Sequence, residues 1–380
     1  MSVIFDLKDL DTKTSNKIVK ALTLLPKAPQ FQKYQKYQAA QEPIRMYCTR
    51  EGKTRLPFQF ACLYFKKRFN QDKVFGKIYK DPNGKFTGKL LDRQKEPFKE
   101  AISLIKKHNT VTIALYPGFG KTFMGVMLAW YLNKKVCVLV HRDNVGKQWV
   151  KSFKQYFSEL TDDDIWFVDN KVKENAKIIV SMDGRTDKIP ESMRDDIGTL
   201  IIDEAHCFCA PSKVKPLLTF SPKYIIAETA TPKKDNGLET VIQSICGVHY
   251  IQKTSTKPYY FFILQTNIKY ELEECKNIFG ELTNKQITNE ERNNIIIEIM
   301  KANQQYKTIV AGNRKDHCKY LAERLEEEGL ESSQLHGTIK NYVTKNILIG
   351  TGSKMGVGFD EANFCDDYDG RPSDLLIMLY

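Results

Sequence analysis

The sequence lacks any apolar run long enough to cross a membrane, and its first residues lack the pattern of a signal peptide. Its nine cysteines are scattered through 380 residues. Only Cys207 and Cys209 lie close together, and no Cys-x-x-Cys pair is present. These absences argue against a membrane-spanning protein, a disulfide scaffold and a zinc site. We therefore expect an intracellular protein with reduced thiols, long enough for two or three domains.

Net charge is missing from most of the chain. Residues 90–380 hold 39 Lys and Arg and 39 Asp and Glu, so their charges balance. Residues 1–89 hold nineteen Lys and Arg and seven Asp and Glu, so this segment carries the whole net charge of +12. Such a confined basic excess is typical of nucleic-acid contact, in which phosphates bind Lys and Arg with release of counterions. Aromatic residues lie among these charges at residues 31–37 and 63–69. They fit either stacking on bases or a small hydrophobic core with lysines on its solvated face.

A phosphate-binding loop is indicated at residues 117–122, with the sequence PGFGKT. A buried strand at residues 111–115 precedes it, and an apolar helix follows it. In this context the backbone N–H groups of the loop and the helix dipole favour a phosphate. Lys121 can reach the β- and γ-phosphates, and the hydroxyl of Thr122 can bind Mg²⁺. The common pattern has glycine where Leu115 stands, and a glycine turn before a core helix is the alternative interpretation.

Two adjacent carboxylates, Asp203 and Glu204, follow the apolar run at residues 199–202. Open α/β sheets place their ligands at the carboxyl ends of the strands. Asp203 is therefore placed to hold Mg²⁺, directly or through water, and Glu204 to orient and deprotonate an attacking water. The same two residues on a solvated loop would carry no such meaning. The interpretation depends on the strand before them and on the phosphate loop upstream.

With the sequence DEAH at residues 203–206, these motifs resemble the superfamily-2 helicases and translocases, over about residues 90–360. The resemblance implies ATP and Mg²⁺ as cofactors and two RecA-like domains that close on the nucleotide and reopen after hydrolysis. If each domain grips the backbone in turn, the cycle moves the protein along one strand without reading base edges. We therefore expect an ATP hydrolase of the helicase or translocase type.

The resemblance also implies roles for particular residues of the first half. It implies that the nucleotide is held by Gly118, Phe119, Gly120, Lys121, Thr122 and Gln94, with Gln94 as the reader of adenine. It implies that nucleic-acid contact, or its coupling to the nucleotide, involves Arg142, His206, Thr229 and Thr231. Simple strand-end capping is the alternative for the two threonines, and glutamine before a helix is commonplace.

The second half carries a motif of its own at residues 351–360, with the sequence TGSKMGVGFD. It follows a predicted strand at residues 346–351 and resembles the family motif in which Thr351 touches the nucleic-acid backbone. In that motif Gly358 and Asp360 face the nucleotide. Its glycines allow the unusual dihedrals that a switch loop requires, and a glycine-rich surface loop is the alternative.

One feature of the family has no counterpart in this sequence. The family strand that corresponds to residues 374–379 leads into a final motif with a glutamine and arginines, one of which acts as an arginine finger on the γ-phosphate. The sequence ends at Tyr380, and the position of Arg371 does not fit the finger. Because such a finger raises the rate of phosphoryl transfer by orders of magnitude, hydrolysis by these residues alone is open to question. We expect a fragment or a truncated form of a longer motor.

The expected fold is α/β, with tandem RecA-like domains built on parallel sheets, the second incomplete at its C-terminus. A small basic accessory domain at residues 1–88, ending near a turn at residues 81–84, should precede the first RecA-like domain at residues 89–255. That domain carries the ATP site. Residues 256–380 should form the second RecA-like domain, which opens with a strand at residues 259–265.

Within the superfamily, one branch is the most similar. Gln148 and Trp149, the sequence TATP at residues 229–232 and the short basic N-terminal domain resemble the branch that contains the nucleotide-excision-repair helicase. The same branch holds phage branch-migration helicases and the transcript-release helicase of poxviruses and other large DNA viruses. This resemblance implies DNA, double-stranded or branched, ahead of RNA as the partner. It also implies a viral origin, with the host cytoplasm or the virion as the location.

Three alternatives remain open. An RNA helicase shares every motif, so stimulation of ATP hydrolysis by DNA and by RNA must be compared. A translocase subunit of a restriction or remodelling machine also fits, although no nuclease-like cluster of carboxylates and lysine stands out. The third alternative is a regulatory protein that binds ATP and nucleic acid without turnover.

Overall fold

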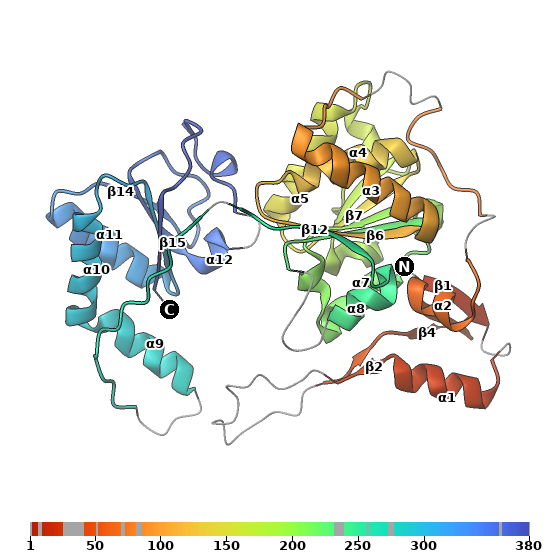
Figure 1. Cartoon of the computed structure of the whole chain (residues 1–380), viewed down its shortest axis with the longest axis horizontal. Helices are drawn as coiled ribbons and strands as arrows, with labels where there is room; N and C mark the ends of the chain where they lie inside the picture. The colour runs from red at the N-terminus through yellow and green to blue at the C-terminus, as the bar shows by residue number, and fades with distance from the viewer. Residues whose placement is uncertain are drawn as a thin grey trace. The chain divides into compact units, whose positions relative to one another are not determined.

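The computed structural model describes residues 2–6, 10–25, 42–50, 52–69, 73–80, 86–231, 239–256, 258–272, 277–356 and 359–379. The chain forms two compact units, residues 1–257 and 258–380 (Figure 1). The predicted domain boundaries after residues 88 and 255 stay predictions. Several segments used above lie outside the described residues: residues 31–37, 81–84 and 232, Gly358 and Tyr380.

A seven-stranded parallel sheet forms the centre of the first unit, in the order β12-β6-β11-β10-β7-β9-β8. Its strands are β6 (Thr110–Leu115), β7 (Val136–Val140), β8 (Ile165–Phe167), β9 (Ile178–Met182), β10 (Thr199–Ile202), β11 (Tyr224–Thr229) and β12 (Tyr250–Lys253). Four of them, β6, β7, β9 and β10, read as near-continuous apolar runs because a parallel sheet is buried on both faces. This burial explains why the sequence predicts these strands well.

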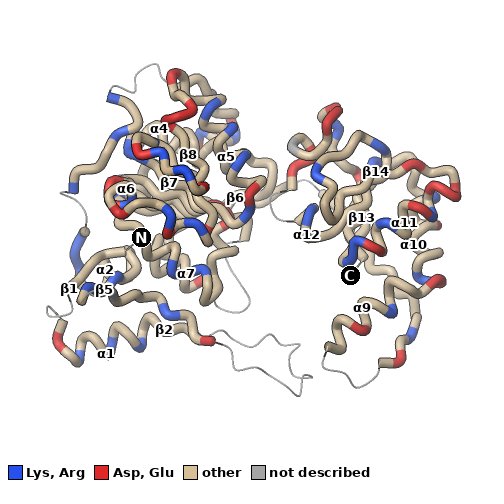
Figure 2. The backbone as a smooth tube through the Cα atoms, turned by 180° about the vertical axis from the view of Figure 1, so that it is seen from behind, with Lys and Arg blue, Asp and Glu red and all other residues tan. Residues whose placement is uncertain are grey.

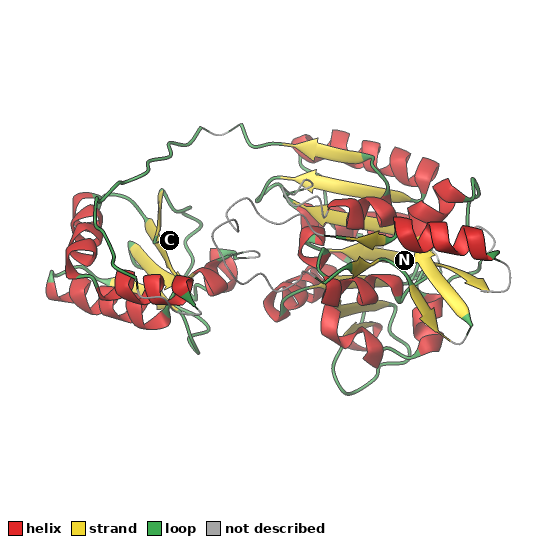
Figure 3. Ribbon diagram, turned by 90° about the horizontal axis from the view of Figure 1, so that it is seen from below, coloured by secondary structure: helices red, strands yellow, loops and turns green. Residues whose placement is uncertain are grey.

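Helices cover both faces of this sheet (Figure 3). One face packs against α3 (Asp92–His108), α4 (Lys121–Leu132) and α5 (Asp143–Tyr156). The opposite face packs against α6 (Glu191–Asp196), α7 (Pro211–Leu218) and α8 (Glu239–Cys246). The result is a three-layer arrangement in which the carboxyl ends of all seven strands lie at one edge, where ligands bind in open α/β sheets.

The basic N-terminal segment folds onto the second of these faces. It contains β1 (Ser2–Asp6), α1 (Thr12–Ala21), β2 (Thr23–Leu24), β3 (Ile44–Arg45), β4 (Cys48–Arg50), β5 (Lys53–Pro57) and α2 (Phe58–Tyr64). Strands β1, β5 and β4 form an antiparallel sheet, and β2 pairs with β3. Leu56 and Phe58 join the hydrophobic core that includes α7 and α8. In the structure this segment therefore shares a core with the parallel sheet.

The aromatic residues at positions 63–69 serve mainly this packing. The rings of Phe65 and Phe69 lie 4.7 and 5.5 Å from that of Phe5, measured between centroids. Of the two interpretations of these aromatics, the hydrophobic core fits Phe65 and Phe69. The other aromatic stretch, at residues 31–37, lies outside the described part of the chain.

The second unit is built on a four-stranded parallel sheet in the order β14-β15-β13-β16. Its strands are β13 (Thr308–Gly312), β14 (Ser332–Leu335), β15 (Ile347–Thr351) and β16 (Leu375–Met378). Its helices are α9 (Ile278–Thr288), α10 (Glu290–Ala302), α11 (Lys315–Glu327) and α12 (Gly352–Met355). Two parallel sheets packed with helices confirm the predicted α/β class with tandem RecA-like domains.

The predicted strand at residues 259–265 is wrong. These residues form no strand, and their side chains are exposed, with Tyr260 88% and Phe262 85% accessible. The aromatic and β-branched composition matches a strand, but such residues form a strand only where a neighbouring strand pairs with them. No described strand of either unit pairs with this segment.

Candidate nucleotide and nucleic-acid site

The phosphate loop joins the carboxyl end of β6 to the first turn of α4. Two of its glycines adopt left-handed backbone, Gly118 with φ +78° and Gly120 with φ +98°. A Cβ on Gly118 would meet no atom within 4 Å, whereas a Cβ on Gly120 would lie 2.4 Å from the Nε2 atom of Gln94. Glycine is therefore required at both positions by conformation, and at Gly120 also by space.

Lys121 and Thr122 form the beginning of α4. Gly120 is the N-cap, and α4 starts at Lys121. The Nζ atom of Lys121 donates to the carbonyl oxygen of Leu115 at 3.2 Å, so the ammonium group lies back along the strand that delivers the loop. Thr122 follows in the first helical turn and is half-buried. A helix N-terminus with a lysine and a hydroxyl is a setting that favours a bound phosphate.

Gln94 makes a hydrogen bond to the backbone of this loop. It is buried near the start of α3, where its Oε1 atom accepts from the N–H of Leu91 at 2.9 Å. Its Nε2 atom donates to the carbonyl oxygen of Phe119, also at 2.9 Å. Both ends of the amide are thus engaged within the protein. The reading of adenine by Gln94 stays a prediction, while its contact with the loop is a structural fact.

Asp203 lies at the carboxyl end of β10, beside the loop. It is 6% exposed, and its Oδ2 atom accepts from the indole N–H of Trp149 at 2.8 Å. Its Oδ1 atom accepts from the N–H of Glu204 at 2.9 Å. Burial raises the pKa of Asp203 to about 6, and the hydrogen bond from Trp149 opposes this rise. Trp149 therefore orients one oxygen of the carboxylate expected to hold Mg²⁺.

Glu204 connects this carboxylate to a line of polar groups. Its backbone is left-handed, with φ +46°, and its Oε2 atom lies 3.3 Å from Nδ1 of His206. That nitrogen lies 3.0 Å from Oγ1 of Thr229, which in turn accepts from the N–H of Thr231 at 3.0 Å. Burial raises the pKa of Glu204, and the charge of Lys121 opposes the rise. Three of the predicted coupling residues, His206, Thr229 and Thr231, are therefore linked across the ends of β10 and β11, and Glu204 lies within ion-pair distance of His206.

Glu228 is a residue that sequence reasoning missed. It lies on β11, is fully buried, and neither of its carboxyl oxygens has a hydrogen-bond partner among the described residues. Its pKa is raised well above the ordinary value, first by burial and then by the charge of Asp203. A Cβ added to Gly125 of α4 would lie 2.5 Å from Oε1 of Glu228 and 2.6 Å from the ring of Trp149. A lone acid directly after the apolar run at residues 224–227 is the signal that could have identified it.

Two of the remaining predicted residues, Arg142 and Thr351, lie at or just after the carboxyl ends of other strands. Arg142 is half-buried and is the N-cap of α5, directly after β7. In the second unit, Thr351 ends β15, and its Oγ1 lies 3.0 Å from Oγ of Ser353. Asp360 is exposed, and its carboxylate accepts from the N–H of Ala362 at 3.1 Å. Gly358 lies outside the described residues.

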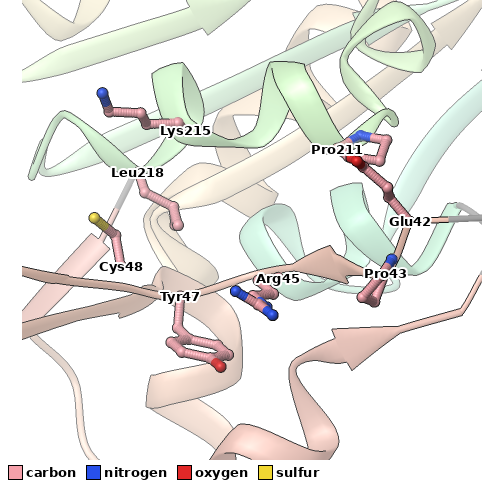
Figure 4. A pocket seen from close by; sticks show the side chains of 8 residues that line it. All are labelled: Glu42, Pro43, Arg45, Tyr47, Cys48, Pro211, Lys215 and Leu218. Carbon is pink, nitrogen blue, oxygen red and sulfur yellow. The ribbon is translucent and has the colours of Figure 1, made fainter.

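Three further features of the described residues concern metal clusters, membrane-spanning helices and cavities. No group of three or more His, Cys, Asp or Glu among them could hold a metal ion, and no helix among them has the length and apolar character needed to cross a membrane. A cavity of about 510 Å³ lies between residues 42–48 and α7 (Figure 4). Its charge is mixed, because Glu42 lines it together with Arg45 and Lys215.

Comparison with known proteins adds to this geometry. Residues 87–234 match the family described as "Type III restriction enzyme, res subunit". "Putative helicase 161L" of Invertebrate iridescent virus 6 is 27% identical over 338 residues, which cover 80% of this chain and 74% of that protein. "Putative helicase 055L" of Frog virus 3 (isolate Goorha) is 26% identical over 288 residues, which cover 71% of this chain. The chain spans 65% of the length of that second relative.

Among solved structures, the helicase domain of Pyrococcus furiosus Hef aligns with a TM-score of 0.44 at 14% identity, over 76% of this chain and 97% of that chain. This likeness is too distant to add to the argument. The sequence matches make the chain similar to viral proteins named as helicases, and the phosphate loop, the buried Asp203 and the contacts from Glu204 to Thr231 agree with the resemblance to superfamily-2 helicases and translocases, enzymes that hydrolyse ATP.

Proposed function

We propose that this protein uses the energy of Mg-ATP hydrolysis to step along a nucleic-acid backbone, and that it acts on DNA in preference to RNA. The observation that carries this proposal is the connected path from Glu204 through His206 and Thr229 to Thr231, beside the phosphate loop. A path of polar contacts that begins at the candidate base and ends beyond the neighbouring strand is suited to passing a change at the γ-phosphate to the end of that strand.

The donor set fits Mg²⁺ rather than a metal held by the protein alone. The two donors predicted for the metal are both oxygens, the hydroxyl of Thr122 and the carboxylate of Asp203. Mg²⁺ usually keeps several waters and binds one or two carboxylates plus the phosphates of a substrate. Open space above Gly118 leaves room for those phosphates. When bound, Mg-ATP supplies the phosphoryl group that is transferred and the charge that these residues neutralise.

Each of the predicted catalytic residues then has a distinct role. Lys121 moves from the carbonyl of Leu115 to the phosphates, since an ammonium gains more from an anion than from a neutral carbonyl. Asp203 is held in one orientation by Trp149. Glu204 accepts a proton from the attacking water, and the rise in its pKa caused by burial makes it a better acceptor near neutral pH.

The preference for DNA is supported by resemblance and by charge. The viral relatives carry helicase names that specify no polymer, so the choice of DNA depends on the resemblance to a branch that acts mainly on DNA. The basic excess of twelve in residues 1–89 adds phosphate affinity to the first unit. It distinguishes nucleic acid from other partners but does not distinguish DNA from RNA.

The test is ATP hydrolysis measured without polymer and with single-stranded DNA, duplex DNA and RNA. The wild-type chain is compared with Glu204→Gln, which keeps the shape of the side chain and removes the base, and with the exposed control Glu100→Gln on α3. We expect turnover stimulated most by DNA, lost by about a hundredfold or more in Glu204→Gln, and unchanged in Glu100→Gln. Stronger stimulation by RNA than by DNA would contradict only the preference for DNA and would leave the rest of the proposal standing. Nucleotide binding without turnover in the wild-type chain would contradict the proposal and favour a regulatory protein.

A further inference from the structure

A second basic site lies at the opposite edge of the parallel sheet from the phosphate loop. A cavity of about 290 Å³ opens between the end of α2 and the end of α3. It is lined by Phe58, Gln59, Cys62, Leu63, Lys66, Lys67, Arg68, Lys107, His108 and Asn109. Four of these residues are cationic and none carries a carboxylate. In the first unit, Lys and Arg also recur along α1 and β5 (Figure 2).

The position of this cavity separates it from the nucleotide. His108 and Asn109 immediately precede β6, whereas the phosphate loop follows the other end of the same strand. Six residues of extended chain span about 17 Å at roughly 3.3 Å per residue. The cavity is therefore at the amino edge of the sheet, away from the carboxyl edge that carries Arg142, His206 and Thr231.

Only part of this charge is explained by local structure. Arg68 donates to the carbonyl oxygen of Lys107 at 2.7 Å and so caps the C-terminus of α3, an end that favours cations. The ammonium groups of Lys66, Lys67 and Lys107 make no ion pair with any described carboxylate. All three side chains are exposed. Lys67 lies over the ring of Phe69, with its Nζ atom 5.7 Å from the ring centroid, and none of the three charges is neutralised by a described carboxylate.

The backbone at Lys66 adds an independent observation. Its φ is +51°, in the left-handed region that non-glycine residues rarely adopt. Glycine or asparagine would occupy this turn at lower cost. A lysine is nevertheless present, and it lines the cavity. The N–H of Lys67 donates to the carbonyl oxygen of Cys62 at 3.2 Å, so this left-handed turn ends α2 and places Lys66 among the residues that line the cavity.

The positive potential also acts on the neighbouring histidines. The rings of His108 and His249 stack with centroids 4.1 Å apart. The pKa of His108 is lowered, first by burial and then by the charges of His249, Lys107 and Arg68. The histidine remains neutral near pH 7, so it offers a ring nitrogen to a ligand without adding repulsion to the cluster.

We propose that this amino-edge cavity, formed by Lys66, Lys67, Arg68 and Lys107, binds the phosphate backbone of a DNA duplex at a point away from the motor's track. Among the described lining residues the aromatic rings on α2 and α3 are Phe58, which is 1% exposed, and His108, whose ring already stacks on that of His249. Sites for single strands combine cations with stacking aromatics, so cations alone favour a duplex, whose bases are already paired. This inference rests on the proposed function, because it assumes that nucleic acid is the partner.

The test uses two double variants that remove the same charge. Lys66→Asn with Lys107→Gln removes two cavity cations, and asparagine tolerates the left-handed backbone at position 66. The matched control, Lys17→Gln with Lys20→Gln, removes two exposed cations from α1. Binding of a fluorescent DNA duplex and of one of its single strands is measured by anisotropy over a range of salt concentrations. Thermal melting checks that each variant is folded.

We expect the cavity variant to bind the duplex about tenfold or more weakly at 0.1 M salt, with the slope of log K against log salt reduced by nearly 2. Binding of the single strand and binding by the α1 variant should change much less. Equal losses in the two variants would overturn the proposal, because they would show only a general effect of charge. Equal losses for duplex and single strand would overturn the assignment to a duplex.

A second measurement remains informative if the cavity variant does not fold. Acetylation of lysines in the wild-type protein is followed by mass spectrometry with and without duplex DNA. Slower modification of Lys66, Lys67 and Lys107, but not of Lys17, supports the site, and unchanged rates at all of them contradict it. If the wild-type chain binds the polymers and only these rates are unchanged, the proposed function stands while this inference fails. If it binds no polymer, both fail.

Discussion

At the scale of single residues, the site depends on contacts that are invisible in the motif itself. The DEAH motif predicts the carboxylate of Asp203 as a site residue, but the residue that orients this carboxylate is Trp149, 54 positions earlier in the chain. Glu228 lies one residue before Thr229, inside an apolar strand, and belongs to no motif. Both residues lie on the α4 and α5 side of the sheet, directly behind the phosphate loop. Two predictions follow from their surroundings.

The first concerns the orientation of Asp203. Trp149→Phe keeps most of the buried ring but removes the N–H donor to Oδ2 of Asp203. We expect the Mg²⁺ concentration for half-maximal ATP hydrolysis to rise several-fold, and the free energy of unfolding to fall by about 1–3 kcal/mol. The control is Trp166→Phe, which removes a comparable bond to Asp169 away from the site. An equal change in Mg²⁺ dependence for both variants would refute the assigned role.

The second concerns the buried acid. The unfolded chain ionises Glu228 near pH 4.5, while the folded pKa is raised well above that value. Above pH 4.5 the folded protein therefore binds more protons than the unfolded chain, and the free energy of unfolding falls by about 1.4 kcal/mol per pH unit until the folded pKa is reached. Glu228→Gln should remove this loss and be more stable than the wild-type protein at pH 8.

Denaturant titrations at pH 5, 6.5 and 8 measure this effect. The exposed Glu100→Gln serves as the control and should follow the wild-type curve at every pH. A wild-type stability that does not change with pH relative to Glu228→Gln would show that the carboxyl ionises normally in the folded state.

At the scale of elements, α10 and α11 are joined by one buried hydrogen bond. Nε2 of His317 lies 2.8 Å from Oδ1 of Asn293, and burial lowers the pKa of His317 to about 4. The unfolded histidine titrates near 6.5. Between these two values the unfolded chain binds more protons, so the stability of this helix pair is lost as pH falls from about 6.5 through about 4.

Hydrogen exchange of the amides of α11 reports this loss directly. After correction for intrinsic exchange rates, protection should decrease from pH 7 to pH 5 in the wild-type protein and much less in His317→Gln, which retains an amide donor for Asn293. Lys319→Gln, on the same helix, should behave as the wild-type protein does. A decrease of the same size in His317→Gln would assign the effect to another group.

The elements also show what the sequence can predict. Strands β6, β7, β9 and β10 are predicted because burial on both faces makes each of them a continuous apolar run. The short antiparallel strands β1, β4 and β5 are not predicted, because their pairing joins Ser2 to Pro57 and no local pattern encodes it. The segment at residues 259–265 was predicted as a strand from composition alone, and composition does not supply a neighbouring strand.

The residues of the candidate site likewise fall into those that the sequence predicts and those that it does not. Gly118, Lys121, Asp203 and Glu204 carry their chemistry in local motifs, and the structure brings them to one edge of the first sheet. The partners Trp149 and Glu228 depend on which strands are neighbours, and this order is set by the whole sheet. The proposed roles of Thr351 and Asp360 toward the nucleotide stay predictions.

At the scale of the whole molecule, one continuous run of described residues exposes a large apolar surface. Residues 259–264 are each more than 60% exposed, and all six are large and apolar. An exposed run of this kind favours association between molecules. Replacing Tyr260 and Phe262 by serine should therefore lower the concentration-dependent increase in mass that light scattering detects at high salt.

The control for this prediction removes two isolated apolar residues of the first unit. Val74 and Val248 are 91% and 73% exposed, so Val74→Ser with Val248→Ser makes a comparable change outside the run. The control should scatter light as the wild-type protein does. If both double variants reduce association equally, the effect belongs to general surface hydrophobicity and not to this segment.

The close approach of Gly125 to Glu228 and Trp149 also limits how this protein can evolve. A methyl group at position 125 collides with both side chains at once, although alanine is the better helix former. Glu228 and Trp149 must therefore be replaced by smaller residues before Gly125 can change. The replacement of Trp149 removes the N–H group that donates to Asp203. The order in which mutations are tolerated is thus constrained, and a library that varies all three positions together should yield functional combinations that single-site variation never reaches.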